Sequence, residues 1–187
     1  HSGFSNELAV QTTVMTREAV ERIARYAFEL ARTRRNHVTS VTKSNALQYT
    51  QVFWDKVVGE IALDYPDIEF DWIYADAATM RFVQNPAFFD VIVTTNLFGD
   101  LLSDLGGAIV GSIGLMASGN INPENDFPSM YEPVHGSTPD IAGKGIANPL
   151  ATILAGAMML ENLGEHHAAT ILKSAVDDLL RGEIKTR

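Results

Sequence analysis

Apolar residues recur at helical spacing near the start of the chain, and a short extended pattern follows them. A helix is predicted after Thr16, which is a good N-cap residue, and the basic run 32–35 suits its end because cations stabilise a helix C-terminus. A β-like run follows at 37–41, and apolar residues on one side of 53–61 then predict a second helix. The apolar positions of the first helix are Val20, Ile23, Ala24, Ala27 and Ala31.

The clearest strand pattern lies at 68–74, where every second residue is large and apolar, and Asp76 comes shortly after it. A short helix that ends at Asn85-Pro86 leads to the apolar run 89–95, which predicts a buried strand with a further helix behind it. This order of strand, helix, strand and helix at short spacing predicts an α/β protein with a mostly parallel sheet.

The residue composition changes after the third predicted strand and the helix that follows it. Residues 111–148 are rich in Gly, Asn and Pro turns, and so long a stretch without regular structure is uncommon unless it is functional. Two helices are predicted to close the sequence, the first with Asn148 as N-cap, Pro149 as first helical residue and Gly164 as its stop. The apolar face of the second is predicted at Ala168, Ile171, Leu172, Ala175, Val176 and Leu179.

Composition narrows the classes of function. The chain has 187 residues, of which 46% are hydrophobic, so it can bury a core. No apolar run approaches about 18 residues and no basic-then-apolar leader is present, so we expect no membrane span, no signal peptide and a cytoplasmic location. A net charge of −9 argues against nucleic-acid binding. The absence of cysteine excludes disulfides and thiolate metal sites.

Two aspartates lie four residues apart on the helix that follows the apolar run 89–95. Asp100 and Asp104 therefore project from one face, about 6 Å apart. Two like charges at that separation are unfavourable unless a cation lies between them or water screens them, and carboxylate oxygens suit Mg²⁺ or Mn²⁺. The alternative is a solvated helix face. The position favours a metal, because open α/β sheets bind ligands where the carboxyl end of a strand leads into a helix.

Asp76 and Lys43 each follow a predicted strand. Asp76 has the same context as Asp100, and with Asp100 and Asp104 it forms a candidate three-carboxylate site for Mg²⁺, although alone it would more often cap a helix. Lys43 lies in a short polar loop, which is a usual place for a catalytic ammonium group, and its alternative is a solvated surface lysine.

The stretch 132–149 is a second candidate site. Asp140 can accept hydrogen bonds from two vicinal hydroxyls of a ribose, and His135 and Asn148 can donate to an adenine or a phosphate. No G-x-G-x-x-G motif is present, and a structural loop in which Asn148 only caps the next helix stays open as the alternative. The glycines that would let the backbone approach a ligand are Gly136, Gly143 and Gly145.

Four segments carry a family resemblance. They are Thr-Lys-Ser-Asn at 42–45, Tyr-Ala-Asp-Ala at 74–77, Asn-Leu-Phe-Gly-Asp-Leu-Leu-Ser-Asp at 96–104 and Glu-Pro-Val-His-Gly-Ser-Thr-Pro-Asp-Ile-Ala-Gly-Lys-Gly-Ile-Ala-Asn-Pro at 132–149. In order and spacing they resemble the isocitrate and isopropylmalate dehydrogenase family of metal-dependent β-decarboxylating dehydrogenases. Within it, the segment 119–130 looks most like the tartrate and D-malate dehydrogenase branch.

The resemblance implies roles for the candidate residues. Asp76, Asp100 and Asp104 would hold Mg²⁺ or Mn²⁺, and Lys43 would take the substrate's hydroxyl proton through water. Asp140 would favour NAD over NADP, because a carboxylate accepts from the ribose 2′-hydroxyl and repels a 2′-phosphate. The residues implied to surround the adenosine half of NAD are His135, Gly136, Ser137, Asp140 and Asn148.

The resemblance also implies an architecture. The expected fold is isopropylmalate dehydrogenase-like but incomplete, with 1–110 as a small dimer-forming domain that carries the metal site and 111–187 as part of a larger parallel-sheet NAD-binding domain. In the family's homodimer, Lys43 and Asp76 of one copy would complete a site with Asp100 and Asp104 of the other copy. Because the family pattern starts earlier and ends later than this chain, we expect the chain alone to be inactive.

The expected activity is oxidative decarboxylation of a small 2-hydroxy dicarboxylic acid, D-malate or tartrate, with hydride transfer to NAD. One alternative is a 3-isopropylmalate or homoisocitrate dehydrogenase, which only the segment 119–130 disfavours. Another is a non-catalytic dimerisation or binding module. The non-catalytic module is disfavoured because it has no use for Lys43 and three carboxylates that face one point.

Overall fold

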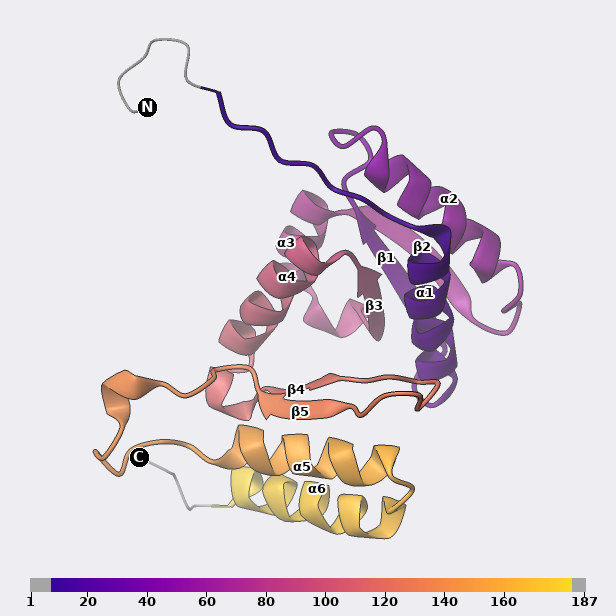
Figure 1. The fold of residues 1–187 in the computed structure, drawn as a ribbon. Coiled ribbons are helices and arrows are strands. Elements are labelled where there is room, and N and C mark those ends of the chain that lie inside the picture. The colour runs from indigo at the N-terminus through magenta and orange to yellow at the C-terminus, as the bar shows by residue number, and fades with distance from the viewer. Residues whose placement is uncertain (1–7, 183–187) are drawn as a thin grey trace. The chain divides into compact units, whose positions relative to one another are not determined.

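The computed structural model describes residues 8–182. The chain divides into two compact units, and the boundary lies between Leu101 and Leu102, inside helix α4 (Asn96–Ile109) (Figure 1). The assignment of 1–110 to a dimer-forming domain and of 111–187 to part of an NAD-binding domain stays a prediction. Within the described residues, no helix is both long and apolar enough to cross a membrane.

The first unit is built on a parallel sheet of three strands in the order β2-β1-β3. Thr42 lies beside Tyr74 on β2, and Val41 lies beside Thr94 on β3, so the carboxyl ends of the strands meet at one edge. The predicted α/β class with a parallel sheet is therefore confirmed. The strands are β1 (His37–Thr42), β2 (Glu69–Tyr74) and β3 (Val91–Thr94).

The helices of the first unit begin and end close to the predicted positions. Thr16 caps the first helix as predicted, because its Oγ1 accepts a hydrogen bond from the Ala19 backbone N at 3.3 Å. The predicted strand 89–95 is shorter than expected, since only Val91–Thr94 pairs with β1. The helices are α1 (Arg17–Arg32), α2 (Thr50–Ala62), α3 (Ala75–Gln84) and the 3₁₀ helix η1 (Pro86–Phe88).

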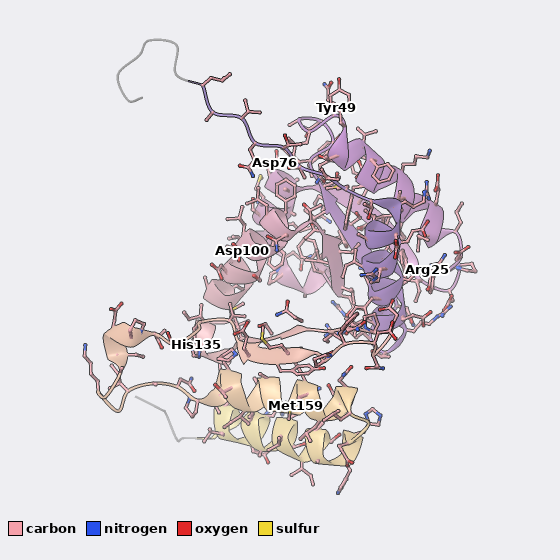
Figure 2. The ribbon with its side chains drawn as sticks, in the orientation of Figure 1. Arg25, Tyr49, Asp76, Asp100, His135 and Met159 are labelled. Atoms are coloured by element: carbon pink, nitrogen blue, oxygen red, sulfur yellow. The ribbon has the colours of Figure 1, made fainter. Side chains whose placement is uncertain are left out.

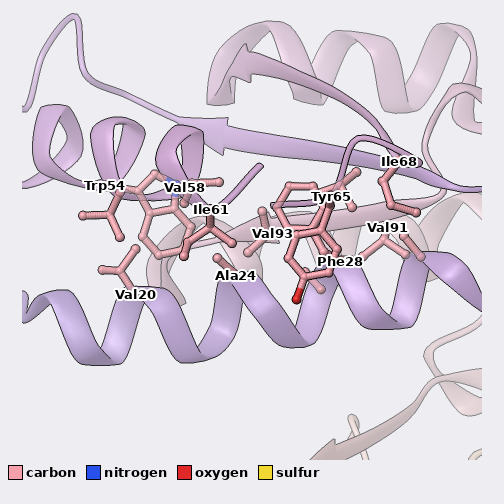
Figure 3. Close-up of a cluster of buried hydrophobic side chains, with 14 residues drawn as sticks. Val20, Ala24, Phe28, Trp54, Val58, Ile61, Tyr65, Ile68, Val91 and Val93 are labelled. Carbon is pink, nitrogen blue, oxygen red and sulfur yellow. The ribbon is translucent and has the colours of Figure 1, made fainter. Parts of the chain in front are cut away.

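One hydrophobic cluster joins α1 and α2 to a face of the sheet (Figure 3). At its centre the buried ring of Phe28 stacks on Tyr65 with a centroid separation of 4.9 Å. Ile23 was predicted on the buried face of α1 but is 43% exposed, because helical spacing puts it at the border of the apolar stripe. The cluster also contains Val20, Ala24, Trp54, Val58, Ile61, Ile68, Val91 and Val93.

The second unit packs a hairpin on α5, which in turn packs against α6 (Figure 1). The predicted irregular stretch 111–148 thus contains an antiparallel pair of strands and two 3₁₀ turns. Its elements are η2 (Ile113–Leu115), β4 (Ala117–Asn120), β5 (Met130–Pro133) and η3 (Pro139–Ile141), and after them come α5 (Leu150–Asn162) and α6 (His166–Arg181).

The last two helices differ in detail from the prediction. Pro149 precedes α5 instead of forming its first residue, while Gly164 ends it as predicted, with a φ of +83°. The predicted face of α6 is wrong at Ile171, which is 55% exposed, and at the exposed Ala175. It is right at Val176, which is buried, as is Ala169. Because apolar residues occupy much of the circumference of α6, periodicity alone did not select the buried side.

Candidate active site

Two of the candidate catalytic residues meet at the carboxyl edge of the sheet in the first unit. Lys43 directly follows β1, and Asp76 lies in the first turn of α3, directly after β2. Because these strands are parallel and in register at their ends, the two side chains come together, with Lys43 Nζ 2.6 Å from Asp76 Oδ1. The lysine side chain is 26% exposed and the aspartate side chain 70%, so the pair opens to solvent.

The charge of Asp76 is stabilised by its surroundings. The Lys43 ammonium, which donates a hydrogen bond to the carboxylate, lowers the pKa of Asp76 below its usual value of 3.8, and backbone N–H groups at the start of α3 act in the same direction. Asp76 is therefore ionised at neutral pH. An anion in this position also suits the positive end of the helix dipole.

A buried amide lies behind this pair. Gln51 of α2 is 2% exposed, and its Oε1 accepts from Thr42 Oγ1 and from the backbone N of Lys43, each at 3.3 Å. Its Nε2 donates to Thr95 Oγ1 at 3.4 Å. We did not predict a role for Gln51 from the sequence. The available signal was a polar residue three positions before Trp54, on the apolar face of α2.

The two other predicted metal ligands lie on α4. Both Asp100 and Asp104 are exposed, and Leu97 and Leu101 of the same helix are 63% and 59% exposed. In residues 8–182, no three His, Asp or Glu side chains lie close enough together to hold a metal ion. The predicted three-aspartate group is therefore not found within the described part of one copy. Asp76 and Asp100, which are labelled in Figure 2, both belong to the first unit. The carboxylate oxygens are chemically suited to Mg²⁺ or Mn²⁺.

The second unit contains a pocket of about 420 Å³ next to the predicted cofactor loop. Of the five predicted cofactor residues, His135 (Figure 2) and Asn148 line it. Gly136, Ser137 and Asp140 belong to the same loop but are not part of the lining, and Asp140 lies exposed in η3. The other lining residues are Ser112, Ile113, Gly114, Thr138, Ile141, Ile146 and Ala147.

Backbone conformation shapes this loop. Gly136 has a φ of +63°, and the non-glycine Thr138 has a φ of +39°, both in the left-handed region that glycine adopts most easily. Gly143 and Gly145 share that region, with φ of +74° and +65°. These positions let the chain turn sharply within 136–145, next to the pocket.

Asn148 joins the loop to α5 and to η2. Its Oδ1 accepts from the backbone N of Leu150 at 3.0 Å, which confirms the predicted capping role one residue away from the cap position. Because this bond uses an oxygen lone pair, the amide N–H groups can still donate to a ligand. Gly114 lies so close that an added Cβ would be 3.1 Å from the Cβ of Asn148.

The chain matches known proteins along its length. A family model described as isocitrate/isopropylmalate dehydrogenase matches residues 1–187. The chain is 54% identical to a 3-isopropylmalate dehydrogenase of Thermobifida fusca over 98% of its residues. It is 48% identical to a probable tartrate dehydrogenase/decarboxylase of Bacillus subtilis over 100%, and 54% identical to the decarboxylating D-malate dehydrogenase of Escherichia coli over 88%.

Solved structures give the same result. The isocitrate dehydrogenase of Methylococcus capsulatus superposes with a TM-score of 0.85 at 51% identity, covering 90% of this chain and 49% of that one. A beta-decarboxylating dehydrogenase of Thermococcus kodakarensis gives 0.80 at 41% identity, with 98% and 53% covered. The chain spans about half the length of its curated relatives, 52%, 52% and 46% for the three named above. The chain belongs to the isocitrate/isopropylmalate dehydrogenase family.

Proposed function

We propose that this chain carries the metal-binding and adenosine-binding residues of an NAD-dependent enzyme that oxidatively decarboxylates D-malate or tartrate. The observation that carries the proposal is the ion pair of Lys43 with Asp76 at the carboxyl edge of a parallel sheet, where α/β proteins bind ligands. The names of the relatives from B. subtilis and E. coli support the substrate class.

The proposed metal site needs two copies of the chain. Asp76 of one copy and Asp100 and Asp104 of the other would hold Mg²⁺ or Mn²⁺, since the described part of one copy gathers no such group. When bound, the cation would lower the pKa of the substrate hydroxyl and stabilise the negative charge that develops as CO₂ leaves. The protein is therefore proposed to act as a homodimer with shared sites.

The chain's own residues would bind the substrates and move one proton. Lys43, as the neutral amine, would take the proton of the substrate hydroxyl through water, and Asp76 would orient the ammonium group that results by accepting a hydrogen bond from it. The loop 135–148 would bind the adenosine half of NAD, whose nicotinamide ring would accept the hydride. Asp140 accepts from the ribose hydroxyls and so selects NAD over NADP.

A second candidate substrate is 3-isopropylmalate, which the 54% identity with the T. fusca enzyme favours. The segment 119–130, which looks most like the tartrate and D-malate branch, favours the smaller acids.

The test uses a completed enzyme, in which the chain is joined to the segments of the E. coli D-malate dehydrogenase that lie outside the matched region. D-malate, tartrate and 3-isopropylmalate are each supplied with NAD and Mn²⁺, and NADH absorbance is followed. We expect the highest kcat/KM with D-malate or tartrate, and a loss of about 100-fold or more in Lys43→Met. A higher kcat/KM with 3-isopropylmalate would favour the second candidate, and unchanged turnover in Lys43→Met would reject the mechanism.

A further inference from the structure

Gln51 is the only polar side chain among the buried residues of α2 in the described structure. The other buried residues of this helix are Trp54, Val57, Val58 and Ile61, which pack into the hydrophobic cluster or against the sheet. Burial of an amide is unfavourable unless its hydrogen bonds are replaced inside the protein. A buried glutamine on an otherwise apolar face therefore indicates a specific set of partners.

The partners fix how the amide is oriented. A backbone N–H can only donate, so the atom that faces the backbone N of Lys43 must be the oxygen of Gln51. The same oxygen accepts from the hydroxyl of Thr42, and the nitrogen then faces the hydroxyl of Thr95. Each of the three groups bonded to Gln51 thus has a compatible partner.

These partners belong to the ends of two neighbouring strands. Thr42 and Lys43 lie at the carboxyl end of β1, and Thr95 lies between the end of β3 and the start of α4. A second bond joins the same strand ends, since Thr94 Oγ1 donates to the carbonyl of Val41 at 2.7 Å. The Gln51 side chain therefore links the loop that carries Lys43 to the segment that leads into α4.

We propose that Gln51 is a positioning residue for the reaction, which holds the backbone at Lys43 in place relative to the start of α4. The inference rests on the role proposed for Lys43. The three hydrogen bonds of Gln51 are long, at 3.3 to 3.4 Å, so each contributes little to stability. We expect them to act mainly by fixing the position of the Lys43 backbone. Displacement of a reacting group by about 1 Å can lower turnover about 100-fold, which sets the size of the expected effect.

The main variant is Gln51→Met, which keeps the length of the side chain and removes all three hydrogen bonds. The matched control is Ser40→Ala. Ser40 is 2% exposed on the same face of β1, and its hydroxyl accepts from Trp54 Nε1 of α2 at 3.0 Å. Both variants remove buried bonds between α2 and β1, but only the first removes a partner of Lys43. Gln51→Glu is the conservative variant, because it keeps an oxygen that can accept from Lys43.

The first measurement is hydrogen exchange of the Lys43 backbone amide by NMR in the chain itself. Gln51→Met should speed this exchange by at least about tenfold relative to the amide of Val41, because the acceptor is gone. Ser40→Ala should leave the ratio unchanged, and Gln51→Glu should retain most of the protection. Equal protection of Lys43 in Gln51→Met and the wild type would overturn the proposal.

The second measurement is steady-state kinetics in the completed enzyme. Gln51→Met should lower kcat about 10- to 100-fold and leave KM for NAD within about threefold, with Gln51→Glu between it and the wild type. Ser40→Ala should keep kcat within about threefold of the wild-type value, even if it lowers the melting temperature as much as Gln51→Met does. An equal fall of kcat in Ser40→Ala and Gln51→Met would show a merely structural effect and would overturn the proposal.

The two measurements also separate this inference from the proposed function. If Lys43→Met keeps its turnover, the proposed role of Lys43 fails, whatever the exchange rate of its amide. If Lys43→Met is inactive while Gln51→Met is fully active and exchanges faster, only the positioning role fails. Loss of turnover together with faster exchange of the Lys43 amide supports both.

Discussion

The Lys43 region of the first unit and the loop 135–148 of the second unit are held in place by different means. Lys43 is positioned by side chains, since Asp76 binds its ammonium group and Gln51 binds its backbone. The loop 135–148 is shaped by backbone conformation, with glycines and Thr138 in the left-handed region. The difference predicts two kinds of sensitivity: the first part should respond to the loss of a polar group, and the loop should respond to an added Cβ.

The largest effect is expected from the aspartates of α4, which are proposed to act through their charge. Asp100→Asn and Asp104→Asn in the completed enzyme should each lower turnover by about 100-fold or more and raise the Mn²⁺ concentration needed, because each would remove a proposed charged ligand. The measurement is NADH formation across a Mn²⁺ titration. Wild-type activity at low Mn²⁺ in either variant would remove the metal assignment.

A smaller effect is expected at Asp140, whose carboxylate is proposed to accept from the ribose hydroxyls. Asp140→Lys would reverse that charge, so it should weaken NAD and improve NADP, changing the ratio of their kcat/KM values by about 10- to 100-fold. Steady-state kinetics with both cofactors gives the ratio. An unchanged preference would mean that Asp140 points away from the cofactor.

The backbone part of the comparison is tested at Gly136. Its φ of +63° disfavours any residue with a Cβ by about 1 to 2 kcal/mol, although nothing lies within 4 Å of the added atom. Gly136→Ala should therefore raise KM for NAD while kcat changes less. Gly156→Ala is the control, because this glycine lies within α5 with open space around it and the change should stabilise the helix by about 1 kcal/mol.

If Gly136→Ala and Gly156→Ala leave KM for NAD equally unchanged, the loop conformation does not matter for binding. A rise in KM for both variants would instead point to a general loss of stability in the second unit. Thermal unfolding of both proteins separates these outcomes, since only Gly136→Ala is expected to lower the melting temperature.

The smallest effect concerns an exposed ion pair between Arg32, the last residue of α1, and Asp67, neither of which is a candidate site residue. Arg32 donates to both carboxylate oxygens of Asp67, at 2.8 and 3.0 Å, and this bonding lowers the pKa of Asp67 below its usual value of 3.8. A carboxyl with a lowered folded-state pKa contributes stability above its unfolded pKa and loses it as the pH falls through the folded value. Because the pair is exposed, the contribution is small.

The corresponding variant is Asp67→Asn. Its melting temperature should lie slightly below that of the wild type at pH 7, and the difference should shrink as the pH falls below about 4 and vanish in stronger acid. Thermal unfolding followed by circular dichroism from pH 7 to pH 2 measures it. A difference that grows toward acid pH would have the wrong sign for this ion pair.

Local patterns in the sequence were sufficient for the parts of the site that lie at element ends. The alternation at 68–74 and the β-like run at 37–41 predicted the strands after which Asp76 and Lys43 are found, and parallel pairing then brings the two side chains together. Thr16 and Gly164 likewise mark helix ends by their own chemistry. Such signals need no information from distant residues.

The parts that were missed depend on contacts between distant residues. Gln51 looks like an exception in an apolar stripe until β1 and β3 are placed against α2. The buried side of α6 depends on which of its apolar stripes meets α5. The hairpin within 111–148 depends on pairing between two short segments, Ala117–Asn120 and Met130–Pro133, that carry weak strand patterns of their own.

The central claim is that Lys43 and Asp76 of one copy act with Asp100 and Asp104 of another. Two inactive completed enzymes, Lys43→Met and Asp104→Asn, are mixed, dissociated and allowed to reassociate, and NADH formation is followed with D-malate, NAD and Mn²⁺. Half of the dimers should be mixed, with one of their two sites free of both substitutions, so turnover should recover to roughly a quarter of the wild-type value. Turnover of the reassociated mixture no higher than the sum of the two separate variants would contradict the claim.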